Sequence, residues 1–525
     1  MNKLDKINAK IGRHRWTICA LLFFATTVNY LDRQVLSLLQ PILSEEFNWT
    51  DSDYANITAV FQFGYAICML FAGRLIDKLG TKRGYAWAIV IWSIGAVIHA
   101  FASKIGSIVS LLIGGAGISV LGFMFSRFVL AAGESGNFPA AVKVIAEWFP
   151  KKERSLATGV FNSGANIGAI LAPLTVPWIA FRFGWQWAFI MAGTAGFIWL
   201  VFWIAIYDSP EKRLKANKLT QAEYDRITDD KQETVETKEN VKWFKLLGYR
   251  QTWSFTVGKF MCDGVWWFFL FWLPAYLKAV YRLDSDQIMI PLAVLYSMTM
   301  IGSIGGGWFP AFFINKGMEI YKARMTAMFI IALFPLCVLA AQPLGYLGFW
   351  IPVVLIGVGA SAHQAWSANL HTTVSDMFPK KTVASIVGIG SMAGGLGGVI
   401  VSKVGGAIFD KYREAGIAKS WLRAKADGFG DFVSEIKSIE LLSRHNELIN
   451  PDRKELANMA KEVVEQVKAL DPTAFEQVKN MQFEIVHNEM AVAYTYMFTY
   501  CALAYVAAWC IMKLLVPKFK PITDL

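Results

Sequence analysis

The chain has 525 residues, of which 55% are hydrophobic and only 17% are charged, with a mean hydropathy of +0.39. Soluble proteins carry charge on about a quarter of their residues, so this composition excludes an ordinary soluble enzyme and indicates a polytopic membrane protein. The net charge of +11 would suggest nucleic-acid binding in a soluble domain. Here the distribution of the basic residues matters more than their total, and no nucleic-acid partner is expected.

Apolar windows of about 20 residues, the length that crosses a bilayer as a helix, recur along the chain. They predict an all-α protein with twelve membrane-spanning helices. We place these helices near residues 16–39, 54–77, 85–103, 117–148, 154–180, 185–207, 251–279, 288–314, 322–341, 345–376, 381–410 and 490–515. Segment 104–118 is rich in glycine and is expected to form an irregular outer connection or an overlong helix.

Lysine and arginine gather in alternate short loops, after the second, fourth, eighth and tenth predicted helices. The opposite loops 40–53 and 342–350 contain neither residue. By the positive-inside rule, the basic loops and both termini are predicted to be cytoplasmic. The basic, then apolar, N-terminus resembles a signal peptide, but its long first helix contains polar residues and we expect it to be retained.

Two polar segments interrupt the helices. Residues 208–250 are predicted to be a cytoplasmic linker loop, in which Thr220 and Glu223 form a capping box at the start of a short helix. Residues 411–489 are predicted to be an extracytoplasmic helical insert, with apolar residues at helical spacing: Leu456, Met459, Val463, Val467 and Leu470. The six cysteines lie in the predicted membrane helices at irregular spacing, so we expect no disulfide framework, metal site or cofactor.

Charged residues lie at membrane depth in two predicted helices. The stretch 125–150 is interpreted as the inner part of the fourth helix, and it carries Arg127 and Glu134. They are seven residues apart, on one face and about 10 Å from each other. The first carries Asp32 and Arg33. A charge in the bilayer is costly unless it faces a cavity or an opposite charge. A cavity with two arginines suits a carboxylate, and acids beside it can exchange protons. The alternative is a pair of structural ion pairs.

The second half contains a polar and aromatic group. Trp266 and Trp267 follow Asp263 in one predicted helix, and another helix carries His363, Gln364, Trp366 and Asn369. Indole faces stack on sugar rings, and amides and imidazoles can contact hydroxyl groups. Each lone tryptophan could instead be an interfacial belt residue, and His363 could equally be a structural histidine.

The turn after the second helix reads GRLIDKLGTKR, from Gly73 to Arg83. It resembles the G-x-L-x-D-x-x-G-x-[KR]-[KR] signature of the major facilitator superfamily. This resemblance implies two six-helix bundles, with helices 1–6 in residues 1–207 and helices 7–11 in 251–410. Residues 490–525 then contain helix 12 and a cytoplasmic tail. It also implies that Gly73, Asp77 and Arg83 act in gating and do not bind substrate.

Longer stretches are similar to the bacterial hexuronate transporters of the anion:cation symporter family. These include NYLDRQVLS, SRFVLAAGESGNFPAAVKVIAEWFP, ERSLATGVFNSGANIGAI, KFMCDGVWWFFLFWLP and WSANLHTTVSDMFPKKTVASIVGIGSMAGGLGG. Members take up glucuronate and galacturonate with protons through the bacterial inner membrane. The resemblance implies that Asp32 and Glu134 are the protonation sites and that Arg33 and Arg127 hold the substrate carboxylate. Tyr30, Asn162 and Asn166 would line the same space.

The resemblance does not choose between the two uronates. Relatives that carry aldonates have a glutamine and an asparagine where this chain has Ala165 and Gly395, which disfavours an open-chain sugar acid. We therefore expect a proton-coupled hexuronate importer with no catalytic residues. An importer or exchanger of another organic anion, such as an aldonate, and a non-transporting membrane sensor are the alternatives. The expected partners are the anion, the proton and membrane lipid, and a monomer is expected although the sequence leaves the oligomeric state open.

Overall fold

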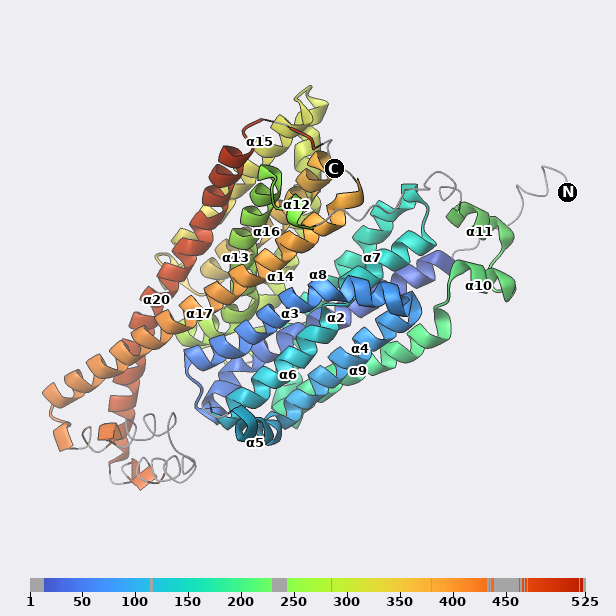
Figure 1. Ribbon diagram of the computed structural model, residues 1–525. Coiled ribbons are helices and arrows are strands. Elements are labelled where there is room, and N and C mark those ends of the chain that lie inside the picture. Colours follow the sequence, from blue (N-terminus) through green and yellow to red (C-terminus); the bar gives the residue numbers. More distant parts are fainter. Residues whose placement is uncertain are drawn as a thin grey trace, which may run out of the picture.

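The computed structural model describes residues 14–113, 117–228, 243–284, 286–378, 380–431, 471–518 and 520–522, with a few further residues between 434 and 469. The elements in these residues are helices, and no strand occurs among them. Figure 1 shows the helices in two groups, the first coloured blue to teal and the second green to red. The apolar stripe predicted between Leu456 and Leu470 lies outside the described residues.

The first bundle contains six membrane spans. Its helices are α2 (His14–Phe47), α3 (Asp51–Leu79), α4 (Thr81–Ile98), α6 (Ile118–Glu134), α7 (Asn137–Trp148), α8 (Lys151–Phe183) and α9 (Trp185–Ile206). The 3-10 helix η1 (His99–Phe101) and helix α5 (Ala102–Ile113) follow α4. Segment 104–113 is therefore helical, and α5 packs against α6.

The second bundle contains the other six spans. Its helices are α13 (Arg250–Tyr281), α14 (Met289–Asn315), α15 (Ile320–Leu333), η3 (Phe334–Ala340), η4 (Gly345–Leu347), α16 (Trp350–Met377), α17 (Lys380–Ala426) and α20 (Pro472–Leu515). Within the described residues, ten helical segments are long and apolar enough to cross a membrane. The more polar α2 and α16, with 34 and 28 residues, complete the twelve. The predicted all-α fold of two six-helix bundles is confirmed.

The fourth span, predicted near residues 117–148, extends over Ile118–Trp148, but it is divided into two helices. Helix α6 ends at Glu134, Ser135 and Gly136 form a turn, and α7 begins at Asn137. Pro139 in the first turn of α7 has no N–H to donate back to the carbonyl of Ser135. The break therefore comes directly after Glu134.

Close packing against α4 fixes the position of α6 along its axis. A Cβ at Gly133 would lie 2.2 Å from the backbone nitrogen of Trp92, and a Cβ at Gly95 would lie 2.5 Å from that of Leu130. Only glycine permits backbones to approach this closely, which is how membrane helices commonly associate. The packing holds Arg127 and Glu134 at a fixed depth.

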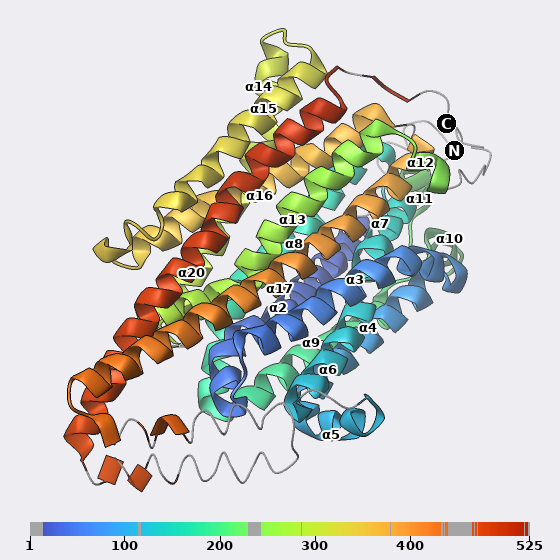
Figure 2. The same cartoon turned by 60° about the vertical axis from the view of Figure 1, so that its left-hand side comes forward.

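The last two spans continue beyond the bundle. Helices α17 and α20 have 47 and 44 residues, whereas about 20 suffice to cross a bilayer. Figure 2 shows them extending together past the end of the bundle that also carries α5. Trp421 and Ala424 of α17 pack there against Val478 of α20. We call this end of the molecule the insert end, and the opposite end, where α2 begins and residues 520–522 lie, the terminal end.

The linker between the bundles contains α10 (Pro210–Lys215), α11 (Gln221–Thr228) and α12 (Trp243–Leu246), at the terminal end (Figure 1). The hydroxyl of Thr220 accepts a hydrogen bond from the backbone N–H of Glu223, as the capping box predicts. The carboxylate of Glu223 instead accepts bonds from the backbone N–H and the guanidinium of Arg15. This contact fastens α11 to the start of α2.

Candidate functional site

Five polar side chains gather where α2 meets α6 in the middle of the first bundle. Each has at most 4% of its surface exposed: Asn29, Asp32, Arg33, Arg127 and Glu134. The four charged residues were predicted from the sequence to share one cavity, and the structure brings them together with Asn29. Burying four formal charges at membrane depth is expensive, so their contacts decide what the cluster can do.

Arg33 and Glu134 form an ion pair between the two helices. Both Nε and Nη2 of Arg33 donate to Oε2 of Glu134, at 3.0 and 2.8 Å. The partner of Glu134 is thus on α2 and is not Arg127, which lies on the same helix and face as Glu134. Charge-assisted bonds of this kind are about twice as strong as neutral ones. Oε1 of Glu134 is buried without a hydrogen-bond partner among the described residues.

Arg127 and Asp32 are the incompletely satisfied members of the cluster. Arg127 donates from Nη2 to the backbone carbonyl of Arg33 at 3.2 Å, while its Nε and Nη1 have no partner in the described part of the chain. Both carboxyl oxygens of Asp32 also lack a partner there. An unpaired buried charge is destabilising by several kcal/mol, so this arrangement favours binding of an anion at Arg127 and of a proton at Asp32.

Aromatic rings surround both guanidinium groups. The Cζ atom of Arg33 lies 4.8 Å from the ring centre of Tyr30 and 5.4 Å from that of Trp267. The ring of Phe61 lies within 5.5 Å of Arg33 and 5.1 Å of Arg127. Cation–π contacts stabilise a desolvated guanidinium without consuming its N–H donors. Trp267, from the second bundle, therefore contacts the charge cluster of the first.

The two tryptophans that were predicted together on α13 have different neighbours. Trp266, which is partly buried, stacks on the imidazole of His363 with ring centres 5.1 Å apart and planes 9° apart. Nδ1 of His363 lies 2.8 Å from the hydroxyl of Tyr505. The imidazole is thus fixed between an indole and a phenol. Trp266 is partly exposed, with one face of its ring covered by His363.

Other members of the polar group on α16 make contacts inside the second bundle. Trp366 is fully buried against Tyr505. The amide of Asn369 donates to the backbone carbonyls of Gly306 and Ala365, at 2.7 and 2.9 Å, which ties α16 to α14. Gln364 is half-buried on α16.

A buried ion pair on α13 was missed by the sequence analysis. Nζ of Lys259 lies 2.6 Å from Oδ2 of Asp263, one helical turn away. The predictions from the sequence included Asp263 but not Lys259. The signal was present, because a lysine four residues before an aspartate within an apolar run places both charges on one helix face.

Three further predicted positions lie along α8 and α17. Asn162 is exposed and Asn166 is half-buried on α8. At Gly395, a Cβ would lie 2.7 Å from the Cβ of Ala66 in the opposite bundle. An asparagine at 395, as in the aldonate carriers, therefore would not fit while α17 and α3 are packed as they are here.

The predicted gating turn lies at the terminal end of α3 and α4. Gly73 lies near the end of α3, Arg83 is exposed in the first turn of α4, and the side chain of Asp77 lies outside what the structure describes. Nearby, the hydroxyl of Thr81 donates to Glu147 of α7, and Lys82 pairs with Asp208 at 3.1 Å. The turn is thus bound to neighbouring elements of the first bundle.

At the insert end, polar contacts close the two bundles against each other. The carboxylate of Asp410 on α17 accepts hydrogen bonds from the backbone N–H groups of Asp51 and Ser52, at 2.7 and 2.9 Å. These groups begin α3, so a residue of one bundle caps a helix of the other. Arg413 pairs with Asp51 at 2.9 Å, and Lys278 donates to the carbonyl of Pro41.

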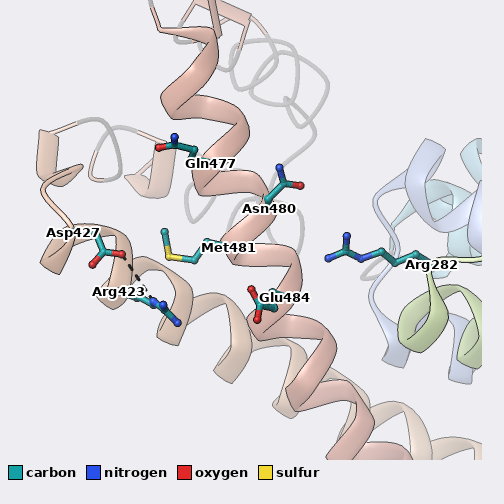
Figure 3. Close-up of a pocket in the computed structure, with 7 residues that line it drawn as sticks. All are labelled: Arg282, Arg423, Asp427, Gln477, Asn480, Met481 and Glu484. Carbon is teal, nitrogen blue, oxygen red and sulfur yellow. Dashed lines mark ion pairs between the residues drawn. The ribbon is translucent and has the colours of Figure 1, made fainter. Parts of the chain in front are cut away.

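A surface pocket of about 550 Å³ lies farther along the insert end, away from the charge cluster. Figure 3 shows its lining residues on the extensions of α17 and α20, with one arginine from the end of α13: Arg282, Arg423, Asp427, Gln477, Asn480, Met481 and Glu484. Arg423 near the end of α17 pairs with Asp427, which directly follows this helix, at 3.9 Å. Arg282 and Arg423 are both exposed to solvent, so this pocket lacks the buried and incompletely paired cation found in the cluster of α2 and α6.

Comparison with known proteins agrees with this geometry. Residues 22–402 match the model of the Major Facilitator Superfamily. The chain is 31% identical to the hexuronate transporter of Escherichia coli K12 over 408 residues, which are 76% of this chain and 89% of that protein. It is 27% identical to the D-galactonate transporter of an Escherichia coli O6:H1 strain, over 77% and 91% of the two chains.

A solved structure also has this fold. The crystal structure of a bacterial homologue of the human lysosomal transporter Spinster, in an inward-facing and occupied conformation, superposes with a TM-score of 0.66. The match covers 98% of this chain and 100% of that one at 16% identity.

Proposed function

The chain belongs to the major facilitator superfamily and is a transporter rather than an enzyme, and from this premise we propose that it imports a hexuronate together with protons. The substrate class is glucuronate and galacturonate. The relatives named as hexuronate and D-galactonate transporters support a sugar acid as the substrate. The packing of Gly395 against α3 favours a ring acid over an open-chain aldonate.

The observation that carries the proposal is the unequal pairing of the charge cluster. Arg127 has two donor groups without a partner, and Asp32 has two oxygens without one, in the described residues. A carboxylate bound at Arg127 would satisfy a guanidinium that the protein leaves incomplete. A proton on Asp32 would remove a charge that has no counter-charge within the cluster's hydrogen-bond network.

Binding of the proton and of the anion is coupled because Glu134 and the substrate carboxylate both interact with Arg33. Glu134 is bound to Arg33 through two hydrogen bonds, and an incoming carboxylate beside Arg127 competes for the same guanidinium. Glu134 then loses part of the attraction that keeps it ionised, so its affinity for a proton rises. Proton and anion therefore favour each other's binding, and this linkage is reciprocal.

The state of the bundles fits one step of alternating access. Asp410, Arg413 and Lys278 fasten the bundles together at the insert end. Entry from that side requires these contacts to break, so the arrangement corresponds to a transporter closed at the insert end. Rocking of one bundle against the other around the central site is the usual mechanism of such folds.

Uptake into proteoliposomes tests the proposal. Labelled galacturonate or glucuronate should accumulate when the side of entry is acidic, and a protonophore should abolish the accumulation. Glucose should not compete, since it would leave Arg127 without a counter-charge. Accumulation of galactonate but not of uronate would identify an aldonate carrier. Uronate exchange at a rate that does not depend on the pH gradient would identify an anion exchanger.

We further propose that this multi-pass protein lies in the bacterial inner membrane with both termini in the cytoplasm. The basic loops at the terminal end support this orientation, which places the linker helices α10 to α12 inside and the insert outside. Protease added to intact spheroplasts should cut within residues 427–471 and leave the linker 208–250 intact. The reverse cleavage pattern would invert the proposed orientation.

A further inference from the structure

The Lys259–Asp263 pair is a second charged group inside the membrane region, separate from the cluster of α2 and α6. Lys259 is 7% exposed, and the side chain of Asp263 is 17% exposed. The pair lies near the middle of α13, whereas the other cations of this helix, Arg250 and Lys278, lie near its ends. None of the roles assigned above uses it.

This pair contributes little as a brace between helices. Arg324 and Asp376 join α15 to α16 at 2.8 Å, so that pair holds two helices together. Lys259 and Asp263 lie on one helix, and a pair four residues apart stabilises a helix only weakly. The penalty of placing two charges in a membrane span is larger, so folding alone does not account for them.

Asp263 lies close to the boundary between the two bundles. A Cβ at Gly394 of α17 would lie 2.3 Å from its Oδ2, so glycine leaves the room that the carboxylate occupies. The next residue, Gly395, packs against Ala66 of α3 in the first bundle. One turn further along α17, a Cβ at Gly398 would lie 2.5 Å from the indole of Trp267 and 3.1 Å from the side chain of Gln62 on α3. Asp263 therefore contacts α17 beside the residues through which α17 meets the first bundle.

The aromatic residues connect this pair to the arginines. The ring of Tyr30 is 4.8 Å and that of Trp267 is 5.4 Å from the guanidinium of Arg33, and Trp267 follows Asp263 by one turn on the same helix face. A sugar acid whose carboxylate binds the arginines would extend its hydroxyl groups across these rings toward α13. Carboxylates accept hydrogen bonds from hydroxyl groups, and such charge-assisted bonds are strong.

We propose that Asp263, oriented by Lys259, is the second bundle's anchor for the substrate and accepts hydrogen bonds from ring hydroxyl groups of the sugar acid. This inference rests on the proposed function and adds a specificity determinant to it. Lys259 is a positioning residue that compensates the charge of Asp263 and holds its carboxylate. A substrate bound in this way contacts both bundles, acid end on the first and hydroxyl end on the second.

The proposed hydrogen bond between Asp263 and a sugar hydroxyl group is tested by changing the protein and the ligand separately and then together. The affinities of purified protein for galacturonate and for its 2-, 3- and 4-deoxy derivatives are measured by calorimetry, for the wild type, Asp263→Asn and the control Asp376→Asn. One of these deoxy derivatives lacks the hydroxyl group that donates a hydrogen bond to Asp263. The wild type should bind that derivative about ten- to hundredfold more weakly than galacturonate. Asp263→Asn should weaken binding of intact galacturonate similarly, and the same deoxy ligand should then lose nothing further.

The control variant should retain all wild-type affinities, because its ion pair lies between helix ends. Wild-type affinities in Asp263→Asn, or an equal loss for every ligand, would overturn the inference. If Asp263→Asn does not fold, Asp263→Glu keeps the charge and moves the carboxylate, so the ranking of the deoxy ligands should change; an unchanged ranking overturns the inference. A wild type that binds neither uronate would overturn the proposed function, and this inference with it.

Discussion

The two bundles place polar groups at the centre of the molecule in different ways. In the first bundle the ion pair Arg33–Glu134 joins two helices, and Arg127 beside it keeps donors without a partner. In the second bundle, Lys259 and Asp263 pair within one helix. The pairing in the first bundle depends on the relative position of α2 and α6, whereas the pair in the second moves as a unit with α13.

This difference suggests that the two charged pairs have different functions. A pair between helices can respond to a bound anion, because the anion competes for one partner and leaves the other to take a proton. A pair within one helix, flanked by aromatic rings, keeps its geometry and suits recognition of a neutral sugar surface. We therefore expect substitutions in the first bundle to change binding of the acid group and proton coupling, and those in the second to change sugar selectivity.

The largest effect is expected for Arg127→Lys. An ammonium cannot reproduce the planar set of donors that a guanidinium offers a carboxylate, so uronate binding should weaken by about a hundredfold or more. Calorimetry on the purified variant measures the loss. Arg324→Lys is the matched control, since Arg324 pairs with Asp376 outside the cluster, and its affinity should stay within about twofold of the wild type. Wild-type affinity in Arg127→Lys would place the anion elsewhere.

Glu134→Gln should separate binding from coupling. The neutral amide mimics the protonated acid, so the variant should still exchange labelled uronate for unlabelled uronate across the membrane. It should fail to accumulate uronate under a pH gradient, because the group whose proton affinity responds to Arg33 is gone. Counterflow and gradient-driven uptake in the same proteoliposomes measure the two activities. Accumulation at the wild-type level would show that Glu134 only holds the helices together.

The sequence was sufficient to predict the charge cluster but not its pairing. Asp32, Arg33, Arg127 and Glu134 stand out because charges are rare in membrane helices. The partner of Glu134 depends on how far α6 is shifted along its axis relative to α2, and close contacts between helices, such as those of Gly95 with α6 and of Gly133 with α4, fix such positions. Such contacts between helices leave no periodic signal in a single sequence. The same limit hid the different surroundings of Trp266 and Trp366.

Those two tryptophans offer a sharper test within the second bundle. Trp266→Ala should remove the surface that stacks on His363 and weaken uronate binding by about tenfold, a typical cost of a lost aromatic contact, with little change in thermal stability. Trp366→Ala should instead lower the melting temperature, because this side chain is fully buried and its loss leaves a cavity. Melting curves and calorimetry of both variants separate the effects. If both variants lose only affinity, Trp366 contacts substrate after all.

The smallest effect on transport is expected in the insert, which should take part in neither function. Helix α17 reaches Ala426 and α20 begins at Pro472, and contacts such as Trp421 with Val478 and Lys419 with Glu489 hold the two extensions together. Replacing residues 429–470 with a short glycine and serine linker preserves these contacts and leaves Asp410 and Arg413 at the closure. Because no residue of the proposed site is removed, uptake should stay within about twofold of the wild type.

A matched variant lacks residues 412–488 and therefore also lacks Arg413 and its ion pair with Asp51. This variant should change the rate at which the insert end opens. Loss of uptake in the first variant, with normal membrane insertion, would mean that the insert itself binds substrate or gates the pathway.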